Sequence, residues 1–438
     1  MESTRCIVLA GVIAASAGGC ARFDPGLPGA QSDASFLAID AASIDAPTPP
    51  PALTVVAGTP RSAGCGINSA ADDCDLTIDT TGAGSITLRN GAAWTDAALT
   101  SVQQDNAPDL ALLQLGRVDI QDEARLRVIG DKPLVIQVSG DIVLNGVIYV
   151  NAVGLEPGAN GGPPGQVPPG GATIAMNCQG KQGAPNGNGG HAGGGGGGFA
   201  TAGAPGGTVC ESPPCCDIDA GPCEGDGAGG GAGASHGSEQ LTTLLGGCGG
   251  GQGAHDDSGN CDNNQGGAGG GAIRLIAAGS ITIGSNGGIN VGGGGGRSGV
   301  EGDDMDPKVP CNDSSGAGGG GSGGAIHLQA ASIDLEGFLA ANGGGGGGAG
   351  GMTSNFVPGQ DGQLSANPAS GGRMSMTPDR GAGGNGGAAG AEPVPGDNYY
   401  YSNGGGGGGA VGRILLSSGQ VTPDPPTGRC SPACVISN

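Results

Sequence analysis

Residues 271–283 read GAIRLIAAGSITI, and residues 324–336 read GAIHLQAASIDLE. In both stretches apolar residues alternate over three to five positions between small or polar breaks, which is the period of β-strands. A turn at residues 284–288 and a third apolar run at residues 289–291 follow the first stretch, before a glycine tract begins. Three short strands in a unit of about 20 to 25 residues are what one coil of a parallel β-helix requires.

Related units occur elsewhere in the chain. Residues 134–150 hold one without glycine padding, and residues 410–416 hold a last, partial one. A single coil cannot bury its apolar face alone, so the units would have to stack across the sequence between them. We therefore predict an all-β chain with a parallel β-helix or similar solenoid core over residues 118–420, which long glycine-rich loops leave and re-enter.

Glycine accounts for 103 of the 438 residues. The longest tracts are residues 193–198, 292–296, 318–324, 343–351 and 404–409. Glycine costs the most backbone entropy on folding and has no side chain to bury, so such tracts are disordered unless their backbones pack regularly. Polyglycine II helices packed side by side are the ordered alternative, because a backbone without Cβ atoms can approach closely and pair its amides laterally. The sequence leaves both alternatives open.

The N-terminus has the outline of a secretory signal. Arg5 precedes an apolar run at residues 7–15, and small residues then lead to Cys20. The run is shorter than the roughly 20 apolar residues that a membrane span needs. Residues 17–20, AGGC, resemble the lipobox of bacterial lipoproteins, in which the cysteine is acylated and becomes the new N-terminus. The resemblance implies lipidation at Cys20, with ordinary signal-peptidase cleavage nearby as the alternative.

The composition divides the chain into five parts. We expect a signal peptide at 1–20, a Pro/Ala/Asp-rich linker at 21–54, an N-terminal β cap at 55–117, the solenoid with glycine-rich insertions at 118–420 and a Pro-rich tail at 421–438.

The formal net charge is −23, from 39 acidic and 16 basic residues. This charge disfavours binding to nucleic acid, because phosphates would be repelled. Asp-rich clusters at residues 72–75 and 303–306 could bind calcium weakly, although such loops are more often simply solvated. We predict no cofactor.

The chain has 14 cysteines, of which 12 remain once Cys6 leaves with the signal and Cys20 is acylated. An even number of thiols in an exported chain predicts disulfides. The candidate local pairs are Cys65 with Cys74, Cys248 with Cys261, and Cys430 with Cys434. His255, between the second pair, would allow a zinc site, but the spacing fits no paired zinc motif.

Two features bear on what the protein could bind or transform. Tyr399, Tyr400 and Tyr401 lie beside Asn residues and could stack on sugar rings, or else pack on the glycine backbone next to them. Asp334 and Glu336, two positions apart in one strand, would share a face, as a carbohydrate-cleaving site would need. The alternative for these acids, and for Asp141, is simple exposure to solvent.

The glycine tracts, together with the Gly-Gly-Ala-Ile-x-Leu units at residues 270–275 and 323–328, resemble the glycine-rich, PE-PGRS-like exported proteins of myxobacteria and their relatives. The resemblance covers about residues 150–420, and the proline-glutamate domain that names the mycobacterial family is absent. It implies exposure at the cell surface and an adhesive or coat-like role. We therefore expect an outer-membrane or cell-surface protein without catalytic activity. Its predicted partners are the membrane, through a lipid anchor, and an extracellular polysaccharide or a neighbouring cell surface. A β-helix polysaccharide lyase or glycoside hydrolase is the alternative.

Overall fold

The chain divides between residues 49 and 50, and the second unit, Pro50–Asn438, is compact. The computed structural model describes parts of the second unit only, namely residues 50–57, 74–173, 175–185, 190–210, 227–255, 264–299, 315–349, 357–373, 381–400, 403–424 and 426–437. Every secondary-structure element in these residues is a β-strand.

Three large sheets contain most of the strands. In pairing order, sheet A consists of β1 (Ala52–Val55), β6 (Arg117–Ile120), β9 (Ile142–Leu144), β13 (Ser280–Ile283), β16 (Ser332–Leu335) and β20 (Val421–Thr422). Sheet B consists of β21 (Cys430–Ser431), β17 (Phe338–Ala340), β14 (Gly288–Asn290), β10 (Val147–Tyr149), β7 (Arg125–Ile129), β2 (Leu76–Asp79) and β3 (Ser85–Leu88). Sheet C consists of β22 (Val435–Ser437), β19 (Arg413–Ser417), β15 (Ala325–Gln329), β12 (Ala272–Ala277), β8 (Leu134–Val138), β5 (Ala107–Leu115) and β4 (Thr100–Gln104). The short strands β11 (Val209–Cys210) and β18 (Tyr399–Tyr400) form a separate pair.

The chain visits the three sheets in a fixed order. From β5 to β21 it passes through sheet C, then A, then B, and β22 returns it to sheet C. Each strand pairs in parallel with the strand one circuit earlier, as β12 does with β8 and β13 with β9. The predicted all-β class with parallel strand pairing is confirmed, and the topology is compatible with a β-solenoid.

The register explains why the strands form where they do. Alternate residues of a strand point to one face, so parallel, in-register pairing places like residues of successive circuits above one another. The inward columns are apolar and buried, for example Ile142, Ile281 and Ile333 in sheet A, Ile148, Ile289 and Leu339 in sheet B, and Leu134, Ile273, Ile326 and Ile414 in sheet C. These columns join into one core cluster.

The ends of the stack differ from the expected boundaries. The antiparallel strands β3 and β4 lie at the N-terminal edges of sheets B and C, within the expected cap. Strand β1 begins in the expected linker and ends at the first residue of the expected cap, and β20, β21 and β22 lie in the expected Pro-rich tail. A run of two to four residues can still complete an inward column, because Leu53 of β1, Val421 of β20 and Cys430 of β21 are buried against the core. All three residues of β22 are exposed.

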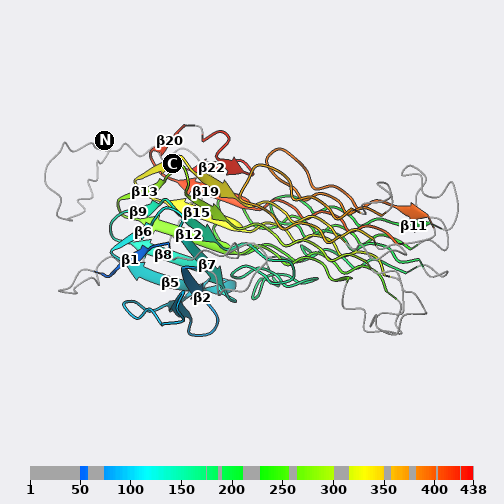
Figure 1. The fold of residues 1–438 in the computed structure, drawn as a ribbon, viewed down its shortest axis with the longest axis horizontal. Coiled ribbons are helices and arrows are strands. Elements are labelled where there is room, and N and C mark those ends of the chain that lie inside the picture. The colour runs from blue at the N-terminus through cyan, green and yellow to red at the C-terminus, as the bar shows by residue number, and fades with distance from the viewer. Residues whose placement is uncertain are drawn as a thin grey trace, which may run out of the picture. The chain divides into compact units, whose positions relative to one another are not determined.

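The glycine-rich segments leave the sheets at one corner. Each long excursion begins after a strand of sheet B and ends at a strand of sheet C: it runs from β10 to β12, from β14 to β15 and from β17 to β19. Figure 1 shows these excursions as extended segments running side by side away from the three sheets.

Backbone hydrogen bonds join the glycine segments in a pattern with a period of three residues. Within residues 193–198, the N–H groups of Gly194 and Gly197 donate to Ala317 O and Gly320 O (2.8 and 2.9 Å). Two further pairs of donors show the same spacing. The N–H groups of Gly195 and Gly198 donate to the carbonyls of Lys181 and Cys178, which belong to one neighbouring segment. The N–H groups of Gly193 and Gly196 donate to the carbonyls of Gly207 and Ala204, which belong to another. Carbonyls of the same stretch accept from three other segments, through the N–H groups of Gly230 and Gly233, Gly407 and Ala410, and Gly251. The segment is therefore bonded to six neighbours.

Candidate functional site

Several residues that the sequence singled out lie outside the described part of the chain. These are Cys20, Cys65, Cys261, Tyr401 and the aspartates at 72–73 and 303–306. The lipidation site, the Cys65–Cys74 pair and the calcium clusters therefore stay predictions.

Two disulfides are present among the described residues. The expected Cys430–Cys434 pair is formed, with a Cα–Cα distance of 5.6 Å. The expected Cys248–Cys261 pair is wrong, because Cys248 is joined to Cys178 across a Cα–Cα distance of 5.9 Å and a sequence separation of 70 residues. Two extended segments that are distant in sequence run side by side, so the nearest thiol in space is not the nearest in sequence.

Two of the candidate tyrosines, Tyr399 and Tyr400, form strand β18, whose pair with β11 lies at the far end of the extended segments from the three sheets (Figure 1). The backbones of Tyr399 and Tyr400 in β18 pair in parallel with Val209 and Cys210 in β11. A role for these tyrosines in ligand contact remains a prediction.

The candidate acids belong to interior strands of sheet A or adjoin their ends: Asp334 lies in β16, Glu336 directly follows β16, and Asp141 directly precedes β9. Asp141 accepts hydrogen bonds from Ser280 N and Oγ (2.7 and 2.9 Å), which hold the pKa of its carboxyl below the usual value. Asp334 and Glu336 are both exposed. In register, Asp334 lies between Thr282 and Thr422, so no second carboxylate flanks it on these described strands.

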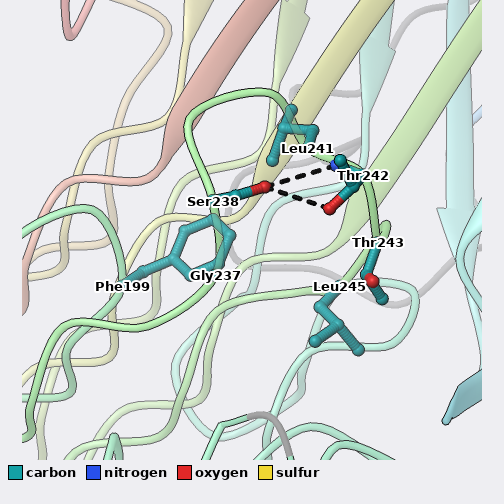
Figure 2. Close-up of a pocket in the computed structure, with 7 residues that line it drawn as sticks. All are labelled: Phe199, Gly237, Ser238, Leu241, Thr242, Thr243 and Leu245. Carbon is teal, nitrogen blue, oxygen red and sulfur yellow. Dashed lines mark hydrogen bonds between the residues drawn. The ribbon is translucent and has the colours of Figure 1, made fainter. Parts of the chain in front are cut away.

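A pocket lies over the outer face of sheet C. Its volume is about 330 Å³, and it is lined by Phe199, Gly237, Ser238, Leu241, Thr242, Thr243 and Leu245 (Figure 2). Leu241 and Leu244 pack with Phe199 against Leu112, Val135 and Leu415 of sheet C. The Thr242 N–H and hydroxyl lie 3.4 and 3.1 Å from Ser238 Oγ. This lining offers hydroxyls and apolar surface but no titratable side chain.

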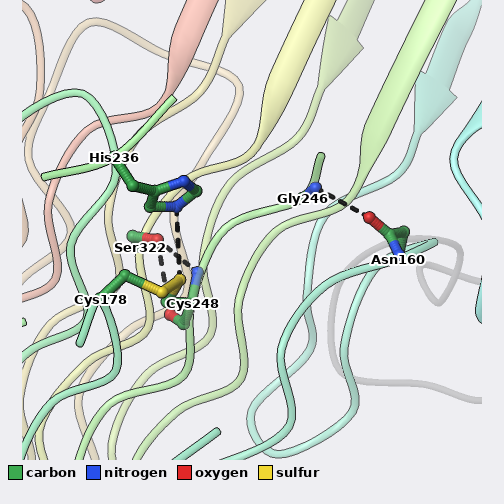
Figure 3. Close-up of a disulfide and its surroundings, with 6 residues drawn as sticks. All are labelled: Asn160, Cys178, His236, Gly246, Cys248 and Ser322. Carbon is green, nitrogen blue, oxygen red and sulfur yellow. Dashed lines mark hydrogen bonds between the residues drawn. A yellow bond between two sulfur atoms is a disulfide. The ribbon is translucent and has the colours of Figure 1, made fainter. Parts of the chain in front are cut away.

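The disulfide between Cys178 and Cys248 has a histidine beside it. His236 Nε2 lies 3.3 Å from Cys248 Sγ, and Ser322 Oγ accepts a hydrogen bond from the Cys248 N–H at 2.8 Å (Figure 3). Both cysteines are fully buried and His236 is 7% exposed. Burial, together with the nearby positive charge of Arg413, lowers the pKa of His236 to about 4, so the imidazole is neutral at pH 7.

A second buried polar cluster joins the sheets to the glycine segments. Arg127 of β7 donates from Nη1 to Asn151 Oδ1 (2.9 Å), and burial lowers the pKa of Arg127 to about 10. The Asp361 carboxylate accepts the N–H groups of Gly154 and Gly295 (2.9 and 2.8 Å), while burial raises its pKa. This carboxylate accepts backbone hydrogen bonds from two glycine-rich excursions at once, so it joins the two segments and has a structural role.

The sequence analysis missed His236, Cys178 and Asp361. None of them lies in a repeating unit, and their partners are 12, 70 and 66 or more residues away in sequence. The even number of cysteines was a signal for the disulfide but not for its connectivity.

No helix in the described part of the chain is both long and apolar enough to cross a membrane. Comparisons of this chain with protein-family models, with curated proteins and with solved structures find no match.

Proposed function

We propose that this chain is an exported, lipid-anchored surface protein with a structural or adhesive role and no catalytic activity, built from a parallel β-helix that carries a bundle of polyglycine II segments. The observation that carries this proposal is the hydrogen-bonding period of the glycine segments.

Polyglycine II has three residues per turn and no internal hydrogen bonds, so its amides are free to bond laterally to neighbours. Donors three residues apart in residues 193–198 bond to the same neighbouring segment, and the carbonyls face three more segments. This supports side-by-side packing of such helices. The fixed order of sheets C, A and B supports a β-helix as their base.

Such a bundle suits a spacer or scaffold. Its interior consists of backbone, so it supplies stiffness through hydrogen bonds while presenting few side chains that could bind or transform a substrate. The disulfides support an oxidising, extracytoplasmic location. The AGGC sequence ending at Cys20 supports a lipid anchor, and the net charge of −23 supports a soluble surface that does not bind nucleic acid. The PE-PGRS-like composition agrees with this role.

The adhesive role is tested by passing the purified protein over immobilised polysaccharides, and by assaying soluble products separately. We expect retention without release of reducing or unsaturated ends, and weaker retention for the Tyr399→Ala/Tyr400→Ala variant. Product release that is lost in Asp334→Asn or Glu336→Gln would replace this proposal with the glycosidase or lyase alternative. If no polysaccharide retains the protein, the adhesive part of the proposal fails and a structural coat protein remains.

The lipid anchor has its own test. Cells expressing the wild-type chain and the Cys20→Ser variant are labelled with a fatty acid analogue and extracted with a phase-separating detergent. We expect label and detergent partitioning for the wild type only. An unlabelled wild type, or equal partitioning of both chains, would rule out the anchor at Cys20.

A further inference from the structure

The site formed by Cys178, Cys248 and His236 brings together three side chains from different extended segments (Figure 3). Their ligand atoms, two Sγ and one imidazole nitrogen, all lie within 4.8 Å of one another. All three side chains are buried. Two sulfurs and one imidazole form a ligand set that zinc favours in proteins.

The histidine is not explained by the disulfide alone. A disulfide sulfur is a weak hydrogen-bond acceptor, yet Nε2 of His236 points at Cys248 Sγ from 3.3 Å. Its other nitrogen, Nδ1, has no hydrogen-bond partner although the residue is only 7% exposed. Burying an imidazole with so few partners is unfavourable compared with an apolar side chain of similar size.

The surroundings fix the imidazole in place. The Phe199 ring lies 4.4 Å from the His236 ring, between centroids, and Arg413 donates to the His236 carbonyl at 3.1 Å. Ser322 Oγ accepts a hydrogen bond from the Cys248 N–H, which holds the backbone of that cysteine. A neutral imidazole in a rigid setting beside two sulfurs is prepared to donate its lone pair to a metal ion.

We propose that Cys178, Cys248 and His236 bind one zinc ion when the disulfide between the two cysteines is reduced. Reduction breaks the S–S bond with two electrons and two protons, which a dithiol supplies as it closes its own disulfide. Zn²⁺ then displaces the two thiol protons to solvent and is held by two thiolates and the His236 imidazole. In oxidising surroundings the two cysteines therefore form a disulfide with His236 beside it, and in reducing surroundings the same three side chains form a metal centre.

The test uses the full chain, unfolded and reduced with a phosphine, then refolded without oxygen in the presence of Zn²⁺ or Co²⁺. The chain has 14 cysteines, so the quantity measured is the difference between variants. We expect the wild type to retain one metal equivalent more than Cys178→Ser/Cys248→Ser. The Cys430→Ser/Cys434→Ser variant, which lacks the other disulfide found within the described residues, serves as the matched control and retains that equivalent.

The histidine is tested by His236→Ala. We expect at least about a tenfold loss of zinc affinity for the extra equivalent, because removing even a group that only supports a ligand costs 10- to 100-fold. We also expect a changed cobalt absorption spectrum. Equal affinity and an unchanged spectrum in His236→Ala would overturn the proposal. The proposal would also be overturned if adding zinc to the reduced wild type did not restore the circular dichroism signal of its β-strands. The same holds if the oxidised protein bound as much zinc as the reduced one.

Discussion

Glycine is required at the centre of the bundle because of the distance between neighbouring backbones. A Cβ atom built at Gly196 would lie 2.0 Å from the carbonyl oxygen of Gly408, and one at Gly319 would lie 2.1 Å from that of Gly195. Backbone cannot rotate away as a side chain can, so such a contact forces segments apart and stretches their hydrogen bonds. Gly231 differs, because its nearest neighbour is the Lys181 side chain at 3.7 Å.

Gly196→Ala is therefore expected to destabilise the fold by about 3 kcal/mol or more, at the upper end of overpacking effects. The matched substitution Gly231→Ala, in a neighbouring segment, is expected to change the free energy of unfolding by less than about 0.5 kcal/mol. Denaturant unfolding of both variants measures the difference. Equal stabilities would mean that the segments are not packed as tightly as their hydrogen bonds require.

Two buried histidines predict acid sensitivity. Burial lowers the pKa of His236 to about 4 and that of His327 to about 3, with Arg413 and Arg274 adding to the respective shifts, whereas both titrate near 6.5 in an unfolded chain. Below pH 6.5 the unfolded state therefore binds protons that the folded state does not. Stability falls from about pH 6.5 down to the folded pKa values, and His236 alone accounts for about 3 kcal/mol by pH 4.

The measurement is the free energy of unfolding between pH 7.5 and pH 4, for the wild type and for His236→Phe. We expect the variant to lose less stability with acid than the wild type does. Identical pH dependences would show that His236 is protonated as easily when folded as when unfolded.

Among the strands, the sequence pattern predicted those that repeat. The unit at β12, β13 and β14 and the unit at β15, β16 and β17 show alternation that is strong enough to assign strands and faces. The pattern failed for β20, β21 and β22 and for the first three residues of β1, because runs of two to four residues beside prolines give no periodic signal. The glycine segments could not be predicted from side chains, because backbone groups alone make their contacts.

Leu275 tests the stacking of strands. It lies between Ile136 and Leu328 in register and is 1% exposed. Leu275→Ala is expected to cost about 2 to 5 kcal/mol, from the lost burial and the cavity left behind. Thr282→Ala, on the outward face of β13, is the control, with an expected change below about 0.5 kcal/mol. Thermal and denaturant unfolding compare the two, and similar losses would contradict the assigned faces.

The two disulfides that join described cysteines should differ in their contribution to stability. A cross-link stabilises by restricting the unfolded chain, and the effect grows with the loop that it closes. The separations of 70 and 4 residues correspond to about 4 kcal/mol for Cys178–Cys248 and about 2 kcal/mol for Cys430–Cys434. Unfolding of the two double serine variants measures this order. A larger loss for Cys430→Ser/Cys434→Ser would contradict it.

For the whole described unit, the question is whether the glycine segments are as ordered as the sheets. Amides that are both buried and hydrogen-bonded exchange only when the structure opens. We expect residues 193–198, 316–323 and 404–409 to exchange as slowly as β12 and β15, measured by hydrogen–deuterium exchange with mass spectrometry. Complete exchange of these segments within seconds, with the strands still protected, would mean that the bundle is absent in solution.

The three-residue period of the hydrogen bonds also restricts how such a chain can change its length. Adding one or two residues to an extended segment would turn every later donor toward the wrong neighbour, by one or two thirds of a turn. Adding three would restore each donor to its own neighbour and lengthen the segment by about 9 Å. Every excursion starts and ends at the same corner of the sheets. Insertions in multiples of three residues therefore keep both the strand register and the hydrogen bonds between neighbouring segments. Folded variants of this protein with insertions or deletions in these segments should thus differ from it in length by multiples of three residues.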